Sequence, residues 1–219
     1  MMKILFAWPM LAVFNLLLLT GCQSAYYGTL EKVGIHKREL MVDRVEDARD
    51  AQEEAKEQFQ SALEQFTSVV QVKGGDLEKT YNKLNDVYEG CKDKADLVHK
   101  RIESVESVSE ALFDEWEDEL REYSSARLRE DSKNKLNKTR RDYERLIKAM
   151  KSAEKKIHPV LVAFHDQVLY LKHNLNAQAI SSLKNELVAI EDNVEGLVRE
   201  MEASIREAEQ FIEALRQET

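Results

Sequence analysis

The sequence predicts an all-α protein of long antiparallel helices that form an extended four-helix bundle or coiled coil. After the N-terminal segment the chain contains one proline, Pro159, and six of its seven glycines, while 33% of all residues are charged. Few chain breakers and many charges are typical of long helices. Apolar side chains also recur in alternating steps of three and four residues, which aligns them along one face of each helix.

The first two predicted helices meet at a pair of glycines. Over residues 41–69 apolar or small side chains follow the seam spacing, with Gln52 as the one polar intrusion. Thr29 is the expected N-cap, and the glycines at 74–75 are expected to end this helix because glycine readily adopts the left-handed conformation. A second stripe over residues 77–116 keeps its spacing for five heptads, which predicts one continuous helix.

Two further stripes complete the predicted bundle. The third covers residues 146–175 and contains Pro159, which is expected to bend the helix; the fourth covers 180–215. The amides between them, at 174–178, either form a turn or fix helix register by buried hydrogen bonds. A turn within 123–133 gives four helices of about 60 Å each. Alternatively, the second and third helices fuse through this charged stretch into a longer, three-element coiled coil.

The N-terminal segment predicts an export signal. Lys3 precedes an apolar run over residues 4–19, which is too short for a comfortable membrane span and leads into small residues. The end of this run resembles the lipobox of bacterial lipoproteins, with Leu19, Thr20, Gly21 and Cys22. This resemblance implies that the sulfur of Cys22 carries diacylglycerol and that Cys22 is the first mature residue. In that class Gln23, rather than Asp, after the cysteine implies the periplasmic face of the outer membrane.

The chain is therefore expected to have three parts. These are a cleaved signal peptide at 1–21, a lipidated flexible tether at 22–28 and a single elongated helical domain at 29–219. Removal of 21 of the 219 residues leaves 198, and the loss of Lys3 changes the formal net charge from −9 to −10. This acidity, together with export, argues against nucleic acid as a partner. Cys91 is the only other cysteine, so no internal disulfide is expected once Cys22 carries lipid.

A basic segment interrupts this acidic chain. Over residues 121–142 eight Lys and Arg stand against four Asp and Glu, a net charge of +4. We call the following residues the basic segment: Arg127, Arg129, Lys133, Lys135, Lys138, Arg140 and Arg141. If the first helix rises from the lipidated end, the turn after the second helix returns to the membrane, where each basic side chain gains about 1 kcal/mol from anionic headgroups. The segment is either a membrane- or partner-facing turn, or a solvated turn paired with acidic neighbours.

No recognisable active site occurs in the sequence. The glycines at 74–75 lack the following Lys-Ser or Lys-Thr pair of a phosphate-binding loop, so no nucleotide is expected. His158, His165 and His173 are spaced by seven and eight residues, whereas a metal site on one helix needs a closer pair. We therefore expect no metal, no cofactor and no catalytic residue.

Several stretches carry a resemblance to a known family, at residues 25–28, 31–38, 43–45, 159–161 and 166–180. They resemble an uncharacterised family of Gram-negative lipoproteins, a domain of unknown function that is rich in coiled coil. The likeness covers nearly the whole mature chain and carries over no catalytic or binding residue. The expected function is a lipid-anchored envelope scaffold or adaptor, without catalytic activity, that binds another envelope component through helix faces. The alternative is a lipid- or small-molecule-binding helical bundle at the membrane surface.

Overall fold

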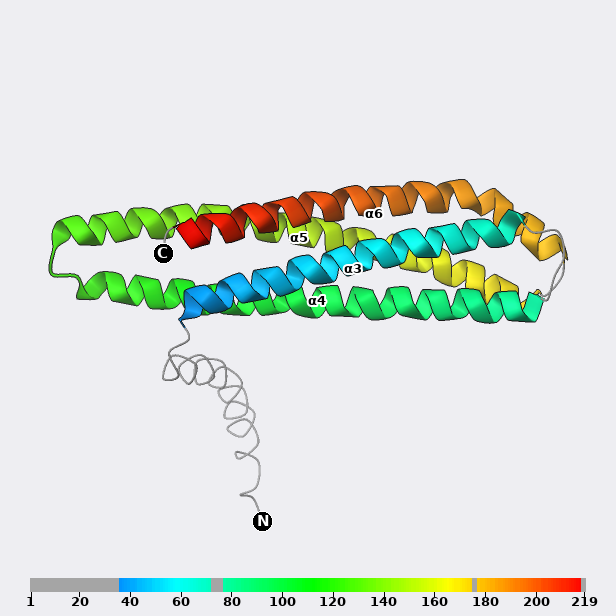
Figure 1. The fold of residues 1–219 in the computed structure, drawn as a ribbon, viewed down its shortest axis with the longest axis horizontal. Coiled ribbons are helices and arrows are strands. Elements are labelled where there is room, and N and C mark those ends of the chain that lie inside the picture. Colours follow the sequence, from blue (N-terminus) through cyan, green and yellow to red (C-terminus); the bar gives the residue numbers. More distant parts are fainter. Residues whose placement is uncertain (1–35, 72–76, 175–176, 218–219) are drawn as a thin grey trace, which may run out of the picture.

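Four long helices make up the protein. The computed structural model describes residues 36–71, 77–174 and 177–217, and for 70–71 and 177–182 it describes the backbone alone. The helices are α3 (Lys37–Gln71), α4 (Leu77–Glu122), α5 (Ala126–His173) and α6 (Ala177–Gln217). Each packs against its two neighbours, α3 against α4 and α6, and α5 against the same two, so α3 and α5 face each other across the core (Figure 1). The prediction of an all-α, antiparallel four-helix bundle is confirmed.

Several predictions fall outside the described residues. They are the signal peptide at 1–21, the tether at 22–28, the N-cap at Thr29 and the glycines at 74–75 that were expected to end the first helix.

The predicted seams form the core. Every position of the third stripe from Leu146 to Leu171 is buried, and the first and fourth stripes bury Phe59, Phe66 and Met201 in the same cluster. The interior is therefore built from residues that recur every three or four positions, because only that spacing keeps an apolar edge facing its neighbours along a helix.

Both joins that the sequence left open separate two helices. Tyr123 to Ser125 separates α4 from α5, at the start of the predicted zone, so the second and third helices are not fused. At the other end α5 continues through Pro159 to His173, although proline removes one backbone hydrogen bond. The Asn174 side-chain amide then donates to the carbonyl of Tyr170 at 2.9 Å. For Asn174, this supports the turn interpretation over a buried amide.

The helices have unequal lengths. We expected about 40 residues in each, whereas α3 and α6 have 35 and 41 residues and α4 and α5 have 46 and 48. The excess in α4 and α5 lies at one end, where these two helices run past the start of α3 and the end of α6 (Figure 1). We call this end the hairpin end.

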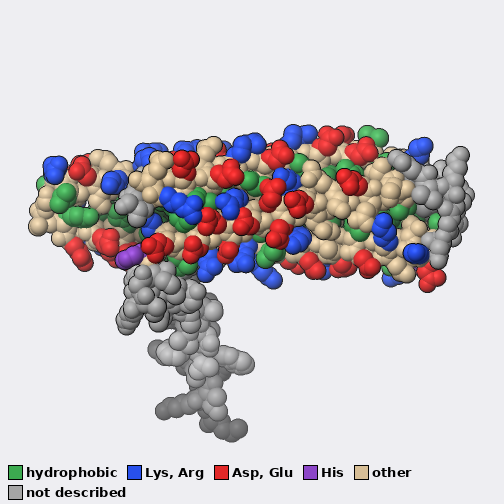
Figure 2. All heavy atoms as spheres, in the orientation of Figure 1, with side chains coloured by type: hydrophobic (Ala, Val, Ile, Leu, Met, Phe, Trp, Pro, Cys, Tyr) green, Lys and Arg blue, Asp and Glu red, His purple; other side chains and the backbone are tan. Residues whose placement is uncertain are grey.

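Polar contacts link the helices at a common level along the bundle. Lys94 of α4 pairs with Glu54 of α3 at 2.6 Å, and Ser152 of α5 donates to Glu200 of α6 at 2.7 Å. The Glu154 carboxylate lies 2.5 Å from His99 Nδ1 and raises the pKa of that histidine above its ordinary value. Positive and negative side chains are intermingled over the face shown in Figure 2.

Cys91 belongs to the core rather than to any reactive site. Its side chain is fully buried on α4, and its thiol donates to the carbonyl of Gln58 at 3.9 Å. Burial raises the pKa of the Cys91 thiol to about 12, because the thiolate would lose its hydration. At neutral pH the residue therefore behaves as a small hydrophobic side chain.

Gln52, the polar intrusion in the first stripe, lies on α3 and is buried in the core of the bundle. Its exposed fraction is 0%, and neither its amide nitrogen nor its amide oxygen has a hydrogen-bond partner among the described residues. A buried polar group without a partner costs about 1–3 kcal/mol relative to the same group in water. Gln52 therefore lowers the free energy of unfolding. Polar residues at seam positions of coiled coils have the same cost, and they restrict the register of the helices.

We expect Gln52→Leu to raise the free energy of unfolding by about 1–2 kcal/mol, because leucine has a similar size and needs no partner. Urea unfolding followed by circular dichroism measures the change. Gln60→Leu is the matched control, since Gln60 is exposed on the same helix and should change stability by less than about 0.5 kcal/mol. Destabilisation by Gln52→Leu would show that the amide has partners in solution.

Candidate functional site

The hairpin end contains a large open cavity. The Lys37 ammonium lies 2.9 Å from the Glu115 carboxylate, so the first turn of α3 sits beside Glu115, and α4 continues beyond that point to Glu122. Those last turns of α4 and the first turns of α5 lack the other two helices as neighbours. The space that remains is a cavity of about 1360 Å³. Its apolar lining residues are Val42, Leu112, Trp116, Leu128 and Leu215.

Trp116 anchors the wall of this cavity. Its indole Nε1 donates to the hydroxyl of Ser132 at 2.8 Å, which ties α4 to α5. The guanidinium of Arg38 lies 4.8 Å from the indole ring centroid, within the range of a cation–π contact. Trp116 packs with Phe113 and Leu136 in a small cluster separate from the main core. The indole therefore holds three helices together where the bundle is incomplete.

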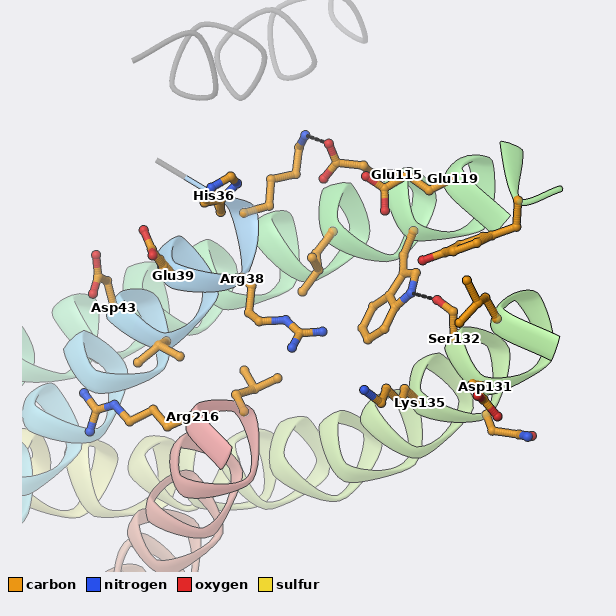
Figure 3. Close-up of a pocket in the computed structure, with 18 residues that line it drawn as sticks. His36, Arg38, Glu39, Asp43, Glu115, Glu119, Asp131, Ser132, Lys135 and Arg216 are labelled. Atoms are coloured by element: carbon orange, nitrogen blue, oxygen red, sulfur yellow. Dashed lines mark hydrogen bonds and ion pairs between the residues drawn. The ribbon is translucent and has the colours of Figure 1, made fainter. Parts of the chain in front are cut away.

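The charged lining of the cavity is almost balanced. Arg38 from α3 and Lys135 from α5 point into it from opposite sides, with the acidic residues around them (Figure 3). The cationic lining residues are Lys37, Arg38, Lys135 and Arg216, and the acidic ones are Glu39, Asp43, Glu115, Glu119 and Asp131. Some of these charges are already paired, since Lys37 binds Glu115 and Arg216 binds Glu46 at 2.8 Å. Such a surface favours neither a polyanion nor a polycation.

The basic segment lies on the first turns of α5 and not in the turn itself. Ser125, the last residue of the turn, is the N-cap of α5, and its hydroxyl accepts from the Leu128 amide at 3.4 Å. Arg129 folds back on this turn and donates to the carbonyl of Tyr123 at 2.6 Å. Of the basic segment, Lys135 alone lines the cavity. The other six residues lie outside it.

The structure sets the basic segment against an acidic stretch of α4. The Arg140 guanidinium lies 2.6 Å from the Glu117 carboxylate and 5.2 Å from the centroid of the Phe113 ring. Over residues 114–142, which form both arms of the hairpin, nine Asp and Glu meet eight Lys and Arg. The net +4 of residues 121–142 is thus offset by the acidic end of α4. For Arg140 this favours the paired interpretation.

Metal-binding side chains do not gather in the described part of the chain. No group of three or more His, Cys, Asp or Glu there could hold a metal ion. His158, His165 and His173 are exposed along α5, and the His165 ring contacts Tyr88 at 5.3 Å between centroids. Among the described helices, none is long and apolar enough to cross a membrane.

Sequence reasoning missed the cavity and the part that Trp116 plays in it. It treated Trp116 as the last position of the second stripe, which was correct for burial. The signal was present in the stripe lengths, since residues 41–69 form a much shorter stripe than residues 77–116. Helices of unequal length cannot all end together, so one end of the bundle had to be incomplete.

Over the residues that the structure describes, the fold and the cavity define an antiparallel four-helix-bundle protein with one open end. The chain belongs to the family described as Protein of unknown function (DUF2959), whose model matches residues 26–215. The predicted resemblance to a domain of unknown function is confirmed. No curated protein and no solved structure gives a significant match.

Proposed function

We propose that the protein is a lipid-anchored scaffold or adaptor of the cell envelope, tethered through Cys22 at the periplasmic face of the outer membrane. It binds a polypeptide segment of another envelope protein in the cavity at the hairpin end. It performs no catalysis, and its binding is independent of nucleotides and nucleic acid.

The charge balance of the cavity carries this proposal. Four cationic and five acidic side chains surround an apolar wall of Trp116 and leucines. An anionic lipid headgroup would be recognised by an excess of positive charge, which this lining does not have. Apolar anchors within a mixed polar rim, with Trp and Arg at the centre, are instead the usual composition of a protein interface. The volume also exceeds the range of about 300–1,000 Å³ typical of small-molecule pockets.

The position of the cavity supports a partner close to the membrane. His36 lines the cavity and is 14 residues after Cys22 in the sequence. A chain of that length spans at most about 50 Å when fully extended. A protein held by lipid on Cys22 would therefore present this end to components within that distance of the membrane surface.

A second candidate is a lipid- or small-molecule-binding bundle. The apolar part of the lining favours it, because an acyl chain could lie against Leu112, Trp116 and Leu128. The two candidates differ in what fills the cavity, and one crosslinking experiment separates them.

The experiment places a photocrosslinking amino acid at Lys135, inside the cavity, in cells that produce the full chain. The adaptor proposal predicts a discrete crosslinked protein band, which Trp116→Ala should weaken because it removes the apolar wall. The matched control is the same probe at Lys83, which is exposed on α4 far from the hairpin end. Mass spectrometry of the adduct identifies the partner.

Two results would contradict the adaptor proposal. Crosslinking of Lys135 to lipid alone would favour the second candidate. Crosslinks of equal yield from Lys135 and Lys83 would show that the cavity has no special part in binding.

A further inference from the structure

The cavity at the hairpin end has an apolar wall that the described helices leave partly uncovered. Leu128, in the first turn of α5, lines the cavity and is 47% exposed. Leu112 and Trp116 lie on the same wall, on α4. An exposed aliphatic side chain beside a large hollow indicates a contact that the four helices do not supply.

The chain enters the bundle at the rim of this cavity. His36 is the first residue that the structure describes, and it lines the cavity together with the first turn of α3. By contrast, α3 and α5 finish at the opposite end of the bundle (Figure 1). The residues that directly precede His36 are therefore covalently joined to the rim.

The ten residues before His36 match the cavity in composition. Five of them are apolar or aromatic: Tyr26, Tyr27, Leu30, Val33 and Ile35. The only charged ones are Glu31 and Lys32, whose charges cancel. The cavity lining is also almost balanced, with four cationic and five acidic side chains around its apolar wall. A neutral segment with aromatic anchors complements such a surface.

This segment is long enough to cover the cavity. Glu115 lies beside the start of α3, and α4 ends seven residues later at Glu122, which is about 10 Å of helix. Ten residues span at most about 35 Å when fully extended. A segment joined at the rim also has an effective concentration on the order of millimolar at the wall. Docking within one chain therefore needs only weak contacts.

The family model begins with this segment rather than with α3. It matches residues 26–215, so it covers residues 26–35 as well as the bundle. At its other limit, Leu215 lines the cavity. Residues 26–35 therefore belong to the same family sequence as the helices that form the cavity.

We propose that residues 26–35 occupy the cavity of their own chain, with Tyr26 and Tyr27 toward Leu128, and that an envelope partner must displace them. The inference rests on the proposed function for the partner, but not for docking of the segment. It makes the cavity selective, because only a partner that binds the wall more tightly than this segment gains access.

Displacement also changes how far the bundle reaches from a lipid on Cys22. When residues 26–35 are docked, Tyr26 is held at the cavity, and it is four positions after Cys22, at most about 14 Å. When they are released, His36 is the first held residue, and it is 14 positions after Cys22, at most about 50 Å. Partner binding therefore lengthens the tether.

The first experiment tests docking without any partner. The mature chain is purified as Cys22→Ser, which carries no lipid and needs no detergent that would compete for the cavity. A photocrosslinking amino acid at Lys135 should crosslink to residues 26–35 of the same chain, as located by mass spectrometry of the peptides. The control is the same probe at Lys83, which is exposed near the other end of α4 and should give no such crosslink.

The second experiment tests displacement in cells that produce the full chain with the probe at Lys135. Tyr26→Ser with Tyr27→Ser removes both aromatic anchors and should raise the yield of the partner adduct at least about twofold, because the segment no longer competes. In the purified chain the same pair of substitutions should abolish the crosslink to residues 26–35. Tyr170→Ser is the matched control, since Tyr170 is 40% exposed on α5 at the opposite end of the bundle and should change neither yield.

Three results would overturn the inference. One is a purified chain in which Lys135 gives no crosslink to residues 26–35. Another is a crosslink that forms solely between two chains, seen as a covalent dimer on a denaturing gel. The third is a yield of partner adduct that the two tyrosine substitutions leave unchanged.

Failure of the proposed function would give a different pattern. No partner adduct would form in cells, with or without the tyrosine substitutions, while the crosslink within the purified chain would persist. That result supports docking of residues 26–35 and contradicts the adaptor proposal.

Discussion

We expect Phe164→Ala to lower the free energy of unfolding by about 3–5 kcal/mol, the largest stability effect among the changes considered for this protein. Phe164 of α5 is fully buried, and its ring lies 4.6 Å from Phe66 and 6.4 Å from Phe59 between centroids, both across the core on α3. These rings join helices that are not neighbours in the bundle. Removal of the Phe164 ring leaves a cavity that α4 and α6 cannot close without moving.

Urea unfolding measures this loss, with Val162→Ala as the matched control. Val162 lies on the same helix half a turn away and is 44% exposed, so its truncation should cost less than about 1 kcal/mol. A loss below about 1.5 kcal/mol for Phe164→Ala would indicate that the α3–α5 contact is not formed as described.

The second large effect concerns the membrane. We expect Cys22→Ala to abolish fatty-acid labelling of the protein and to remove it from the outer-membrane fraction, because the sulfur that would carry the acyl chains is absent. Each buried methylene contributes about 0.8 kcal/mol to anchoring, so the loss of several chains is effectively complete. Labelling with an alkyne fatty acid, followed by separation of inner and outer membranes, measures both.

Cys91→Ala is the control for this experiment, since it makes the same substitution at the other cysteine. Cys91 is buried and its thiol is protonated at neutral pH, so this variant should retain its label and its location. If Cys22→Ala remains labelled or remains in the outer membrane, the lipobox interpretation and the lipid anchor are wrong.

The basic segment illustrates the limit of reading one stretch of sequence alone. Residues 121–142 are cationic when counted by themselves, and the sequence gives no partner for them. Folding brings Glu117 to Arg140, 23 positions later in the chain, and sets the acidic end of α4 along the basic start of α5. The local charge of the hairpin end therefore depends on the α4–α5 register.

The fold class and most of the core were determined by the sequence itself. A repeat of three and four residues allows one solution in water, a helix that buries that edge, so Phe59, Phe66 and Phe164 had to lie inside.

Only the tertiary structure decided where the helices end relative to one another. The contact of Lys37 with Glu115 and the diagonal stacking of Phe164 on α3 join residues that are 78 or more positions apart. Helical periodicity describes the spacing of residues within one helix. It does not determine how far one helix is shifted along the bundle axis relative to another. That offset leaves the last turns of α4 and the first turns of α5 without α3 and α6 as neighbours. It therefore created the cavity around Trp116, because the position of each helix along the bundle axis is set by packing between distant segments.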